Sequence, residues 1–132
     1  LALALAAGAS FIARGFSAQP KPLVQLIKQA IEHRGFSIVE VMSPCVTYNK
    51  INTYAWFKEN VEDLAARGGY APGDRLAAFD ALTREGPIPL GVIYREQRPT
   101  FEDRTGLPEA PLAHLDLHAN RAQLAAMQTA YR

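Results

Sequence analysis

Apolar residues recur with helical spacing in the stretch between Pro22 and Arg34. They lie three and four positions apart, which predicts a helix with a single core-facing stripe. The stripe consists of Leu23, Leu26, Ile27, Ala30 and Ile31. Pro22 suits the first helical turn, where its missing N–H is not needed, and Gly35 suits the C-terminal cap that follows Arg34.

Two short apolar runs flank this helix, and each predicts a strand. They are Phe11–Arg14 and Phe36–Met42, and the second is largely apolar on both faces, as is typical of a parallel sheet covered by helices. Residues 11–42 therefore predict one right-handed βαβ unit. Because two strands are too few for a finished sheet, we expect further strands from a longer polypeptide.

The chain opens with an apolar run, Leu1–Ala7, that Gly8 ends. The run is far shorter than the ~20 residues of a membrane-spanning helix. No basic stretch precedes it, which argues against a secretory signal. We interpret it as a short helix that enters a buried strand, in a chain that is a fragment of a larger protein.

The second part of the chain predicts shorter elements separated by glycine and proline. In chain order they are a helix from Thr53 to about Ala66 ended by Gly68-Gly69, a helix after Asp74 to about Arg84, an isolated strand at Leu90–Tyr94, an extended arm over 95–111 and a helix over about 118–131. We expect residues 1–69 to belong to an α/β domain and residues 70–132 to form a C-terminal extension and arm.

Composition narrows the class of protein. Hydrophobic residues make up 48% and charged residues 20% of the 132 residues, which is ordinary for one globular domain. A net charge of +1 provides no field that would attract nucleic acid or an anionic membrane. A single cysteine forms no disulfide framework, so we expect a reducing, cytoplasmic compartment.

That cysteine, Cys45, is the main candidate for chemistry. It follows Pro44 at the point where the second predicted strand ends, and functional groups of open α/β sheets gather in loops at the carboxyl ends of strands. Three interpretations remain open from the residues alone. Cys45 is a small buried hydrophobe, a reactive thiol that needs a nearby base, or a metal ligand whose partners lie elsewhere.

Other polar residues have simpler interpretations. His114 and His118, with Asp116 between them, have the spacing of a metal pair, but no third ligand follows, so we expect a solvated helix start. His33 lies near a helix end, where the helix dipole favours it. Asp74 within Gly73-Asp74-Arg75 is expected to cap a helix.

Three arginines and an aromatic pair complete the candidates. Arg14 at a strand end suits either a phosphate or carboxylate in a cofactor cleft or a surface ion pair. Arg95 and Arg98 are interpreted as contacts between subunits or solvated charges. Trp56 and Phe57 are expected to lie in the core, with an interface as the alternative.

Several stretches together resemble the β subunit of 2-oxoacid:ferredoxin oxidoreductases, most closely the 2-oxoglutarate type. The specific stretch is Ser43-Pro-Cys-Val-Thr-Tyr-Asn-Lys50. The supporting stretches are Ala6–Arg14, His33–Phe36, Asn52–Phe57 and Leu90–Pro99. The resemblance extends from the first residues to about Thr100 and leaves the alanine-rich tail without an assigned role.

The resemblance implies an enzyme that oxidatively decarboxylates a 2-oxoacid on thiamine diphosphate and Mg²⁺. The family makes an acyl-CoA and passes electrons through a [4Fe–4S] cluster to ferredoxin, and an α subunit is the partner. Its Cys-x-x-Cys pair, further cysteine and Gly-Asp-Gly…Asn segment are absent here. The resemblance thus implies the C-terminal half of a three-layer thiamine-diphosphate-binding-type α/β domain, which is inactive alone.

By the same resemblance, Cys45 corresponds to the fourth cysteine ligand of the cluster, and no catalytic residue is assigned in this chain. Cluster iron requires four thiolates. We expect the backbone N–H groups of Val46 and Thr47 to donate hydrogen bonds to the sulfur. The alternatives are a free-standing interaction module, using the helix 53–66 and the arm 95–111, or a small thiol enzyme that uses Cys45.

Overall fold

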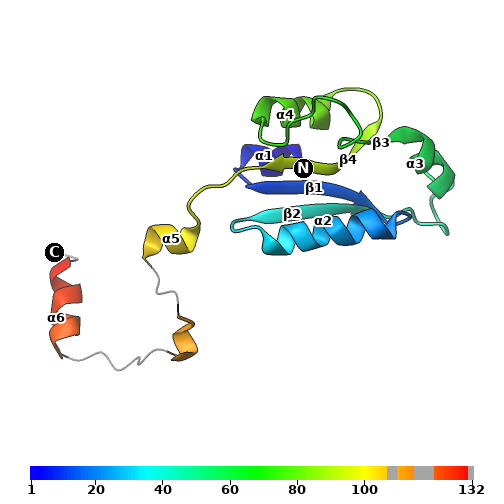
Figure 1. Ribbon diagram of the computed structural model, residues 1–132. Helices are drawn as coiled ribbons and strands as arrows, with labels where there is room; N and C mark the ends of the chain where they lie inside the picture. The colour runs from blue at the N-terminus through cyan, green and yellow to red at the C-terminus, as the bar shows by residue number, and fades with distance from the viewer. Residues whose placement is uncertain (107–109, 115–120, 131–132) are drawn as a thin grey trace. The chain divides into compact units, whose positions relative to one another are not determined.

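The computed structural model describes residues 1–106, 110–114 and 121–130 (Figure 1). Contacts divide the chain into two units, Leu1–Thr100 and Phe101–Arg132. The predicted boundary between residues 69 and 70 falls inside the first unit. No helix in the described ranges is both long and apolar enough to cross a bilayer.

The first unit is built on a four-stranded mixed sheet with the order β2-β1-β4-β3. The strands are β1 (Phe11–Phe16), β2 (Ser37–Met42), β3 (Val61–Asp63) and β4 (Ile88–Arg95). β1 runs parallel to β2 and antiparallel to β4, and β3 runs parallel to β4. The parallel pairing of β1 and β2 around a helix confirms the predicted strand–helix–strand unit, and the α/β class with it.

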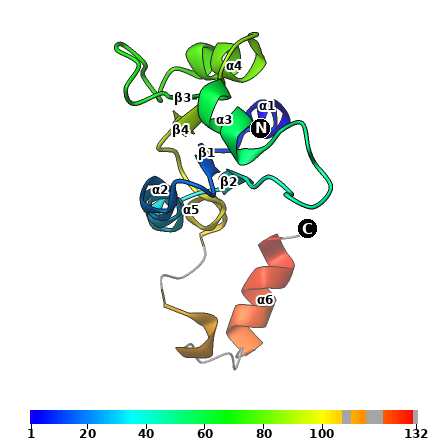
Figure 2. The ribbon, with the colours of Figure 1, turned by 90° about the vertical axis from the view of Figure 1, so that its right-hand side faces the viewer.

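Helices lie on both faces of this sheet (Figures 1 and 2). α2 (Pro20–Glu32) packs Leu26 against Phe11 and Ala13 of β1. On the opposite face, α1 (Ala2–Ala6) and α4 (Arg75–Thr83) pack around Ile12 and Ile93. Each face of the sheet thus has its own core, and a layer of helix covers each face.

A third cluster joins the sheet to α3 (Tyr54–Asn60). Phe16, Phe57 and Leu90 are its buried members, and Tyr54, Trp56 and Met42 pack against them. The Trp56 ring meets the Phe57 ring edge-on at a centroid distance of 5.0 Å. This confirms that Phe57 belongs to the core, while Trp56 is partly buried and packs against that core. The contacts fix α3 directly after the loop that carries Cys45.

Two of the predicted elements were wrong. The helix after Thr53 ends at Asn60 rather than near Ala66, because Val61 adopts extended backbone angles and begins β3. Gly68 and Gly69 therefore lie in a loop and end no helix. The strand predicted as isolated is β4, which lies inside the sheet between β1 and β3.

The second unit contains short helices. They are α5 (Phe101–Thr105), a 3₁₀ turn η1 (Leu112–His114) and α6 (Arg121–Ala130). α5 falls within the segment predicted to be an extended arm, whereas α6 confirms a helix in the alanine-rich tail. The predicted start of that helix, residues 118–120, lies outside the described residues.

Candidate functional site

The loop between β2 and α3 carries Cys45. Ser43 and Pro44 lead out of β2, and the loop then turns so that the Asn49 N–H donates a hydrogen bond to the Cys45 carbonyl oxygen at 3.0 Å. The Lys50 ammonium donates to the Val46 carbonyl oxygen at 2.7 Å. The loop is therefore a compact turn around Cys45 rather than an open connection.

Asn49 organises the second half of this loop. Its side-chain Oδ1 accepts hydrogen bonds from the N–H groups of Ile51, at 3.0 Å, and Asn52, at 2.9 Å. An asparagine that bonds to backbone two residues on is a common turn-forming device. Thr53 then caps α3, because its Oγ1 accepts from the Trp56 N–H at 3.3 Å. The loop is thus held from Cys45 to the start of the helix.

The thiol of Cys45 is exposed, and backbone N–H groups of its own loop act on its pKa. The N–H of Tyr48, foremost, and those of Thr47 and Asn49 lower the pKa of Cys45 below its ordinary value. Partial desolvation opposes this shift in the pKa, but its effect is smaller than that of either Tyr48 or Thr47. Of the two residues predicted to donate, Thr47 is among those that act on the thiol and Val46 is not. Tyr48 and Asn49 were not predicted, because their N–H groups reach the thiol only when the loop turns back on itself.

The geometry favours a thiolate, the form that binds metals and attacks electrophiles. Oriented N–H groups stabilise the negative sulfur and are one of the means by which a protein tunes a cluster's potential. Within the part of the chain that the structure describes, no group of three or more His, Cys, Asp or Glu residues gathers to hold a metal. Among the described residues, Cys45 is thus a single thiol without a group of further metal-ligating side chains beside it.

Large apolar side chains of the same loop point outward. Val46 is 66% exposed, Tyr48 88% and Ile51 80%. Contiguous exposed apolar side chains are a common feature of interaction surfaces. The thiol and its apolar neighbours thus share one exposed loop.

The other candidate residues have structural partners. Arg14 forms an ion pair with Glu40, its register neighbour on β2. Arg98 donates to the Gly8 carbonyl oxygen and lies 3.8 Å from the Glu96 carboxylate. The arginine predicted to face either a cofactor cleft or an ion pair therefore makes the ion pair.

Two further expectations concern helix ends. Asp74 caps α4, as predicted: its Oδ1 accepts from the N–H groups of Leu76 and Ala77 at 2.8 and 3.1 Å. His114 is exposed in η1, while His118 and Asp116 lie outside the described residues. The histidine pair is therefore not placed by the structure.

A buried polar pair at the start of the sheet was not predicted. His33 Nε2 lies 2.9 Å from Ser10 Oγ, and both side chains are buried. Burial, and secondarily the positive charge of Arg95, lowers the pKa of His33. His33 was interpreted only as a helix-end residue, and its partner 23 positions away gives no local signal.

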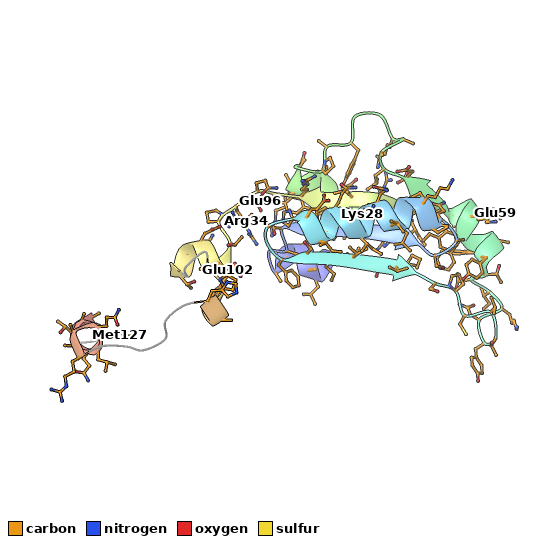
Figure 3. The ribbon with its side chains drawn as sticks, turned by 60° about the horizontal axis from the view of Figure 1, so that its bottom comes forward. Lys28, Arg34, Glu59, Glu96, Glu102 and Met127 are labelled. Carbon is orange, nitrogen blue, oxygen red and sulfur yellow. The ribbon has the colours of Figure 1, made fainter. Side chains whose placement is uncertain are left out.

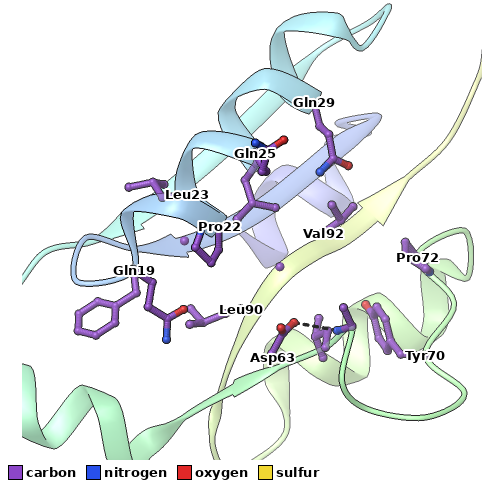
Figure 4. Close-up of a pocket in the computed structure, with 16 residues that line it drawn as sticks. Gln19, Pro22, Leu23, Gln25, Gln29, Asp63, Tyr70, Pro72, Leu90 and Val92 are labelled. Carbon is purple, nitrogen blue, oxygen red and sulfur yellow. Dashed lines mark hydrogen bonds between the residues drawn. The ribbon is translucent and has the colours of Figure 1, made fainter.

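A cavity of about 390 Å³ opens on the α2 face of the sheet (Figure 4). Gly15 and Gly91 line it together with the glutamines Gln19, Gln25 and Gln29. Asp63 is an acidic residue of this lining, which includes no lysine, arginine or histidine. The cavity is thus poorly suited to the diphosphate of a cofactor or to a dicarboxylate substrate.

Comparisons with known proteins agree with this arrangement. The family model described as the C-terminal region of the pyruvate ferredoxin oxidoreductase β subunit matches residues 45–108. The match begins at Cys45, the cysteine of this loop. The fold and the loop therefore define the C-terminal region of a β subunit in a ferredoxin oxidoreductase.

Relatives of known activity and a solved structure extend the match. The β subunit of 2-oxoacid:ferredoxin oxidoreductase 2 from Aeropyrum pernix is 37% identical over 115 residues, covering 77% of this chain and 37% of the relative. The 2-oxoglutarate synthase subunit KorB from Methanothermobacter marburgensis is 48% identical over 124 residues, covering 87% and 40%.

The solved structure is a 2-oxoglutarate:ferredoxin oxidoreductase from Magnetococcus marinus with 2-oxoglutarate, coenzyme A and succinyl-CoA bound. It superposes with a TM-score of 0.79 at 30% identity and covers 96% of this chain and 43% of that chain. The chain belongs to the family of 2-oxoacid:ferredoxin oxidoreductase β subunits. It spans about two fifths of the length of these relatives.

Proposed function

We propose that this chain is the C-terminal part of the β subunit of a cytoplasmic 2-oxoacid:ferredoxin oxidoreductase that acts on 2-oxoglutarate. The complete enzyme would oxidise and decarboxylate the 2-oxoacid, form an acyl-CoA and deliver electrons to ferredoxin, with an α subunit as partner. Support for 2-oxoglutarate comes from the Methanothermobacter and Magnetococcus relatives, both of which are named for that substrate.

Cys45 is proposed to be a ligand of a [4Fe–4S] cluster that transfers electrons when bound. The observation that carries this assignment is an exposed thiol in a compact loop whose backbone N–H groups lower the pKa of Cys45. The loop would hold the sulfur as a thiolate, while Asn49 keeps the donating backbone in place. The remaining ligands would come from polypeptide outside this chain.

Thiamine diphosphate and Mg²⁺ are assigned to the rest of the subunit. The cavity on the sheet face includes no basic side chain, and its carboxylate, Asp63, would repel a diphosphate. The residues of this chain do not fit the cofactor's anionic end, so no step of the reaction is derived from them. Alone, the chain is expected to be inactive.

The test is to co-express this chain with the part of the Methanothermobacter KorB protein that lies outside the shared region. The purified complex should be brown and contain iron and labile sulfide in equal amounts, with a cluster signal in electron paramagnetic resonance after reduction. Cys45→Ala should abolish the signal. Ser43→Ala, two residues away in the same loop, is the matched control and should retain it.

Unchanged iron and an unchanged spectrum in the Cys45→Ala complex would refute the ligand assignment. Rapid alkylation of Cys45 in an iron-free but catalytically active complex would instead favour the thiol enzyme. That alternative also requires a base beside the thiol. The groups that lower the pKa of Cys45 in the structure are backbone N–H donors, which cannot serve as one.

A further inference from the structure

The cavity on the α2 face of the sheet has one wall of carboxamide side chains. Gln25 and Gln29 of α2 and Gln19, which directly precedes the helix, all line the cavity. The two lysines of α2, Lys21 and Lys28, are not part of the lining. Lys28 lies instead on the exposed surface of the helix (Figure 3). This wall of the cavity is therefore polar but uncharged.

The three carboxamides are available to a ligand. Among the residues that the structure describes, none exchanges a hydrogen bond with the side chain of Gln19, Gln25 or Gln29. In Figure 4 the side chains of Gln19 and Gln29 extend toward β4. A carboxamide has an N–H2 donor beside a carbonyl acceptor. The wall therefore fits a ligand whose edge carries an acceptor next to a donor.

Asp63 places a different polar group on the opposite side of the cavity. It is the last residue of β3, and its Oδ1 accepts from the Ala65 N–H at 2.9 Å. This bond holds the carboxylate and leaves its second oxygen without a donor among the described residues. Because a carboxylate only accepts hydrogen bonds, Asp63 selects a ligand that presents an N–H group to it.

Apolar side chains form most of the remaining lining. Leu26, Leu64 and Leu90 line the cavity and are buried in the core. Tyr70 adds an aromatic ring whose position is fixed, because its hydroxyl donates to the Ile93 carbonyl oxygen at 2.6 Å. Flat nitrogen heterocycles stack on aromatic side chains. The volume of about 390 Å³ is within the range of small-molecule sites.

We propose that this cavity binds the adenine base of a nucleoside, a flat ring with an amino group beside an acceptor nitrogen. The amino group would donate to Asp63, and a glutamine carboxamide would pair with an edge of the ring, as glutamine pairs with adenine in DNA. An ammonium ligand fits less well, because it would leave the carboxamide N–H2 groups unpaired. Phosphate groups would stay outside, because the lining includes no basic side chain. The inference does not depend on the proposed function.

Titration of this chain with adenosine, followed by ¹H–¹⁵N NMR, tests the proposal. The side-chain N–H2 signals of Gln19, Gln25 and Gln29 should shift, while that of Asn49, in the Cys45 loop, is the internal control and should not. Inosine has a carbonyl oxygen in place of the amino group, so it should bind about tenfold more weakly, because Asp63 then meets an acceptor. Adenosine monophosphate should bind no more tightly than adenosine.

Asp63→Asn is the variant that separates recognition from stability. Asparagine keeps an oxygen for the Ala65 N–H and replaces the second oxygen with an N–H2 donor, so the preference should reverse toward inosine. Glu59→Gln removes the same charge from α3, outside the cavity lining (Figure 3), and should keep the preference for adenosine. Both affinities are measured on one folded variant, so a small loss of stability does not change their ratio.

Three results would each overturn the inference: no binding of adenosine, equal binding of adenosine and inosine, or an unchanged preference in Asp63→Asn. The same titration of the co-expressed complex shows whether the cavity is open in the complete subunit. Loss of adenosine binding there would assign the cavity to a segment of the rest of the subunit and overturn the inference for the enzyme. The iron content of that complex reports on Cys45 separately, so either proposal can fail alone.

Discussion

Phe57 is the residue through which the Cys45 loop depends on the core. It lies in the first turns of α3, directly after the loop, and is only 8% exposed. Its ring packs against Phe16 at a centroid distance of 5.6 Å and against Trp56. Truncation to alanine would remove most of a buried phenyl ring and leave a cavity between α3 and the sheet.

We expect Phe57→Ala to lower the free energy of unfolding by about 4 kcal/mol, within the range of about 3–5 kcal/mol for buried phenylalanines. Loss of the two ring contacts accounts for about 1–2 kcal/mol of this. Because a domain of this size has about 5–15 kcal/mol in total, the variant would be marginal at 37 °C. Urea unfolding followed by circular dichroism measures the change.

Phe57→Leu is the matched control, since a residue of similar volume retains most of the burial and should cost less than about 2 kcal/mol. The alanine variant should also alkylate Cys45 at an altered rate, because α3 no longer anchors the loop. A loss below about 1 kcal/mol in Phe57→Ala would refute the reasoning. It would show that the cluster of Phe16, Phe57 and Leu90 does not hold α3 against the sheet.

Three further predictions concern stability. Asp74→Ala should cost about 1 kcal/mol in urea unfolding, because two N–H groups at the start of α4 lose their acceptor. Gly35→Ala should cost about 2 kcal/mol or more, since Gly35 has a φ of +140° and an added Cβ would lie 2.4 Å from Ser10 Oγ. Stability should fall as the pH drops below about 6.5, because His33 is neutral in the fold and its lowered pKa means that the unfolded chain binds the proton first.

Each of these has a control. Asp74→Asn should retain most of the cap, and Gly73→Ala, which meets nothing within 4 Å, should cost less than Gly35→Ala. In a His33→Gln variant the slope of stability against pH just below about 6.5 should flatten. An unchanged slope in that variant would assign the acid sensitivity to other groups.

Local sequence patterns predicted the elements that are amphipathic or capped. The apolar spacing over Pro22–Arg34 predicted α2, and Asp74 marked the start of α4. β3 was missed because it has three residues, two of them acidic, and only its pairing with β4 makes it a strand. The position of β4 inside the sheet was not predictable, since it depends on antiparallel pairing with β1 across the chain.

In the candidate site, too, the features with a local sequence signal were predicted and those that depend on the folded chain were not. The position of Cys45 at a strand end followed from the apolar run and Pro44, and the loop geometry supports a thiolate there. The donors from Tyr48 and Asn49 were not predicted, because they follow from a turn closed by the Asn49 side chain. Ser10 and His33 meet only after β1 and the end of α2 have packed, so neither residue indicates the other in the sequence.

The antiparallel course of β4 has a practical consequence. Arg95, near the end of β4, pairs with Phe11 at the beginning of β1, whereas Cys45 follows the end of β2, which is parallel to β1. Residues 96–100 therefore leave the sheet at the end opposite to the one where Cys45 lies. Truncation after Thr100 would cut the chain at that far end, so a shortened chain offers a way to test the proposed cluster ligation without whatever contacts the tail makes.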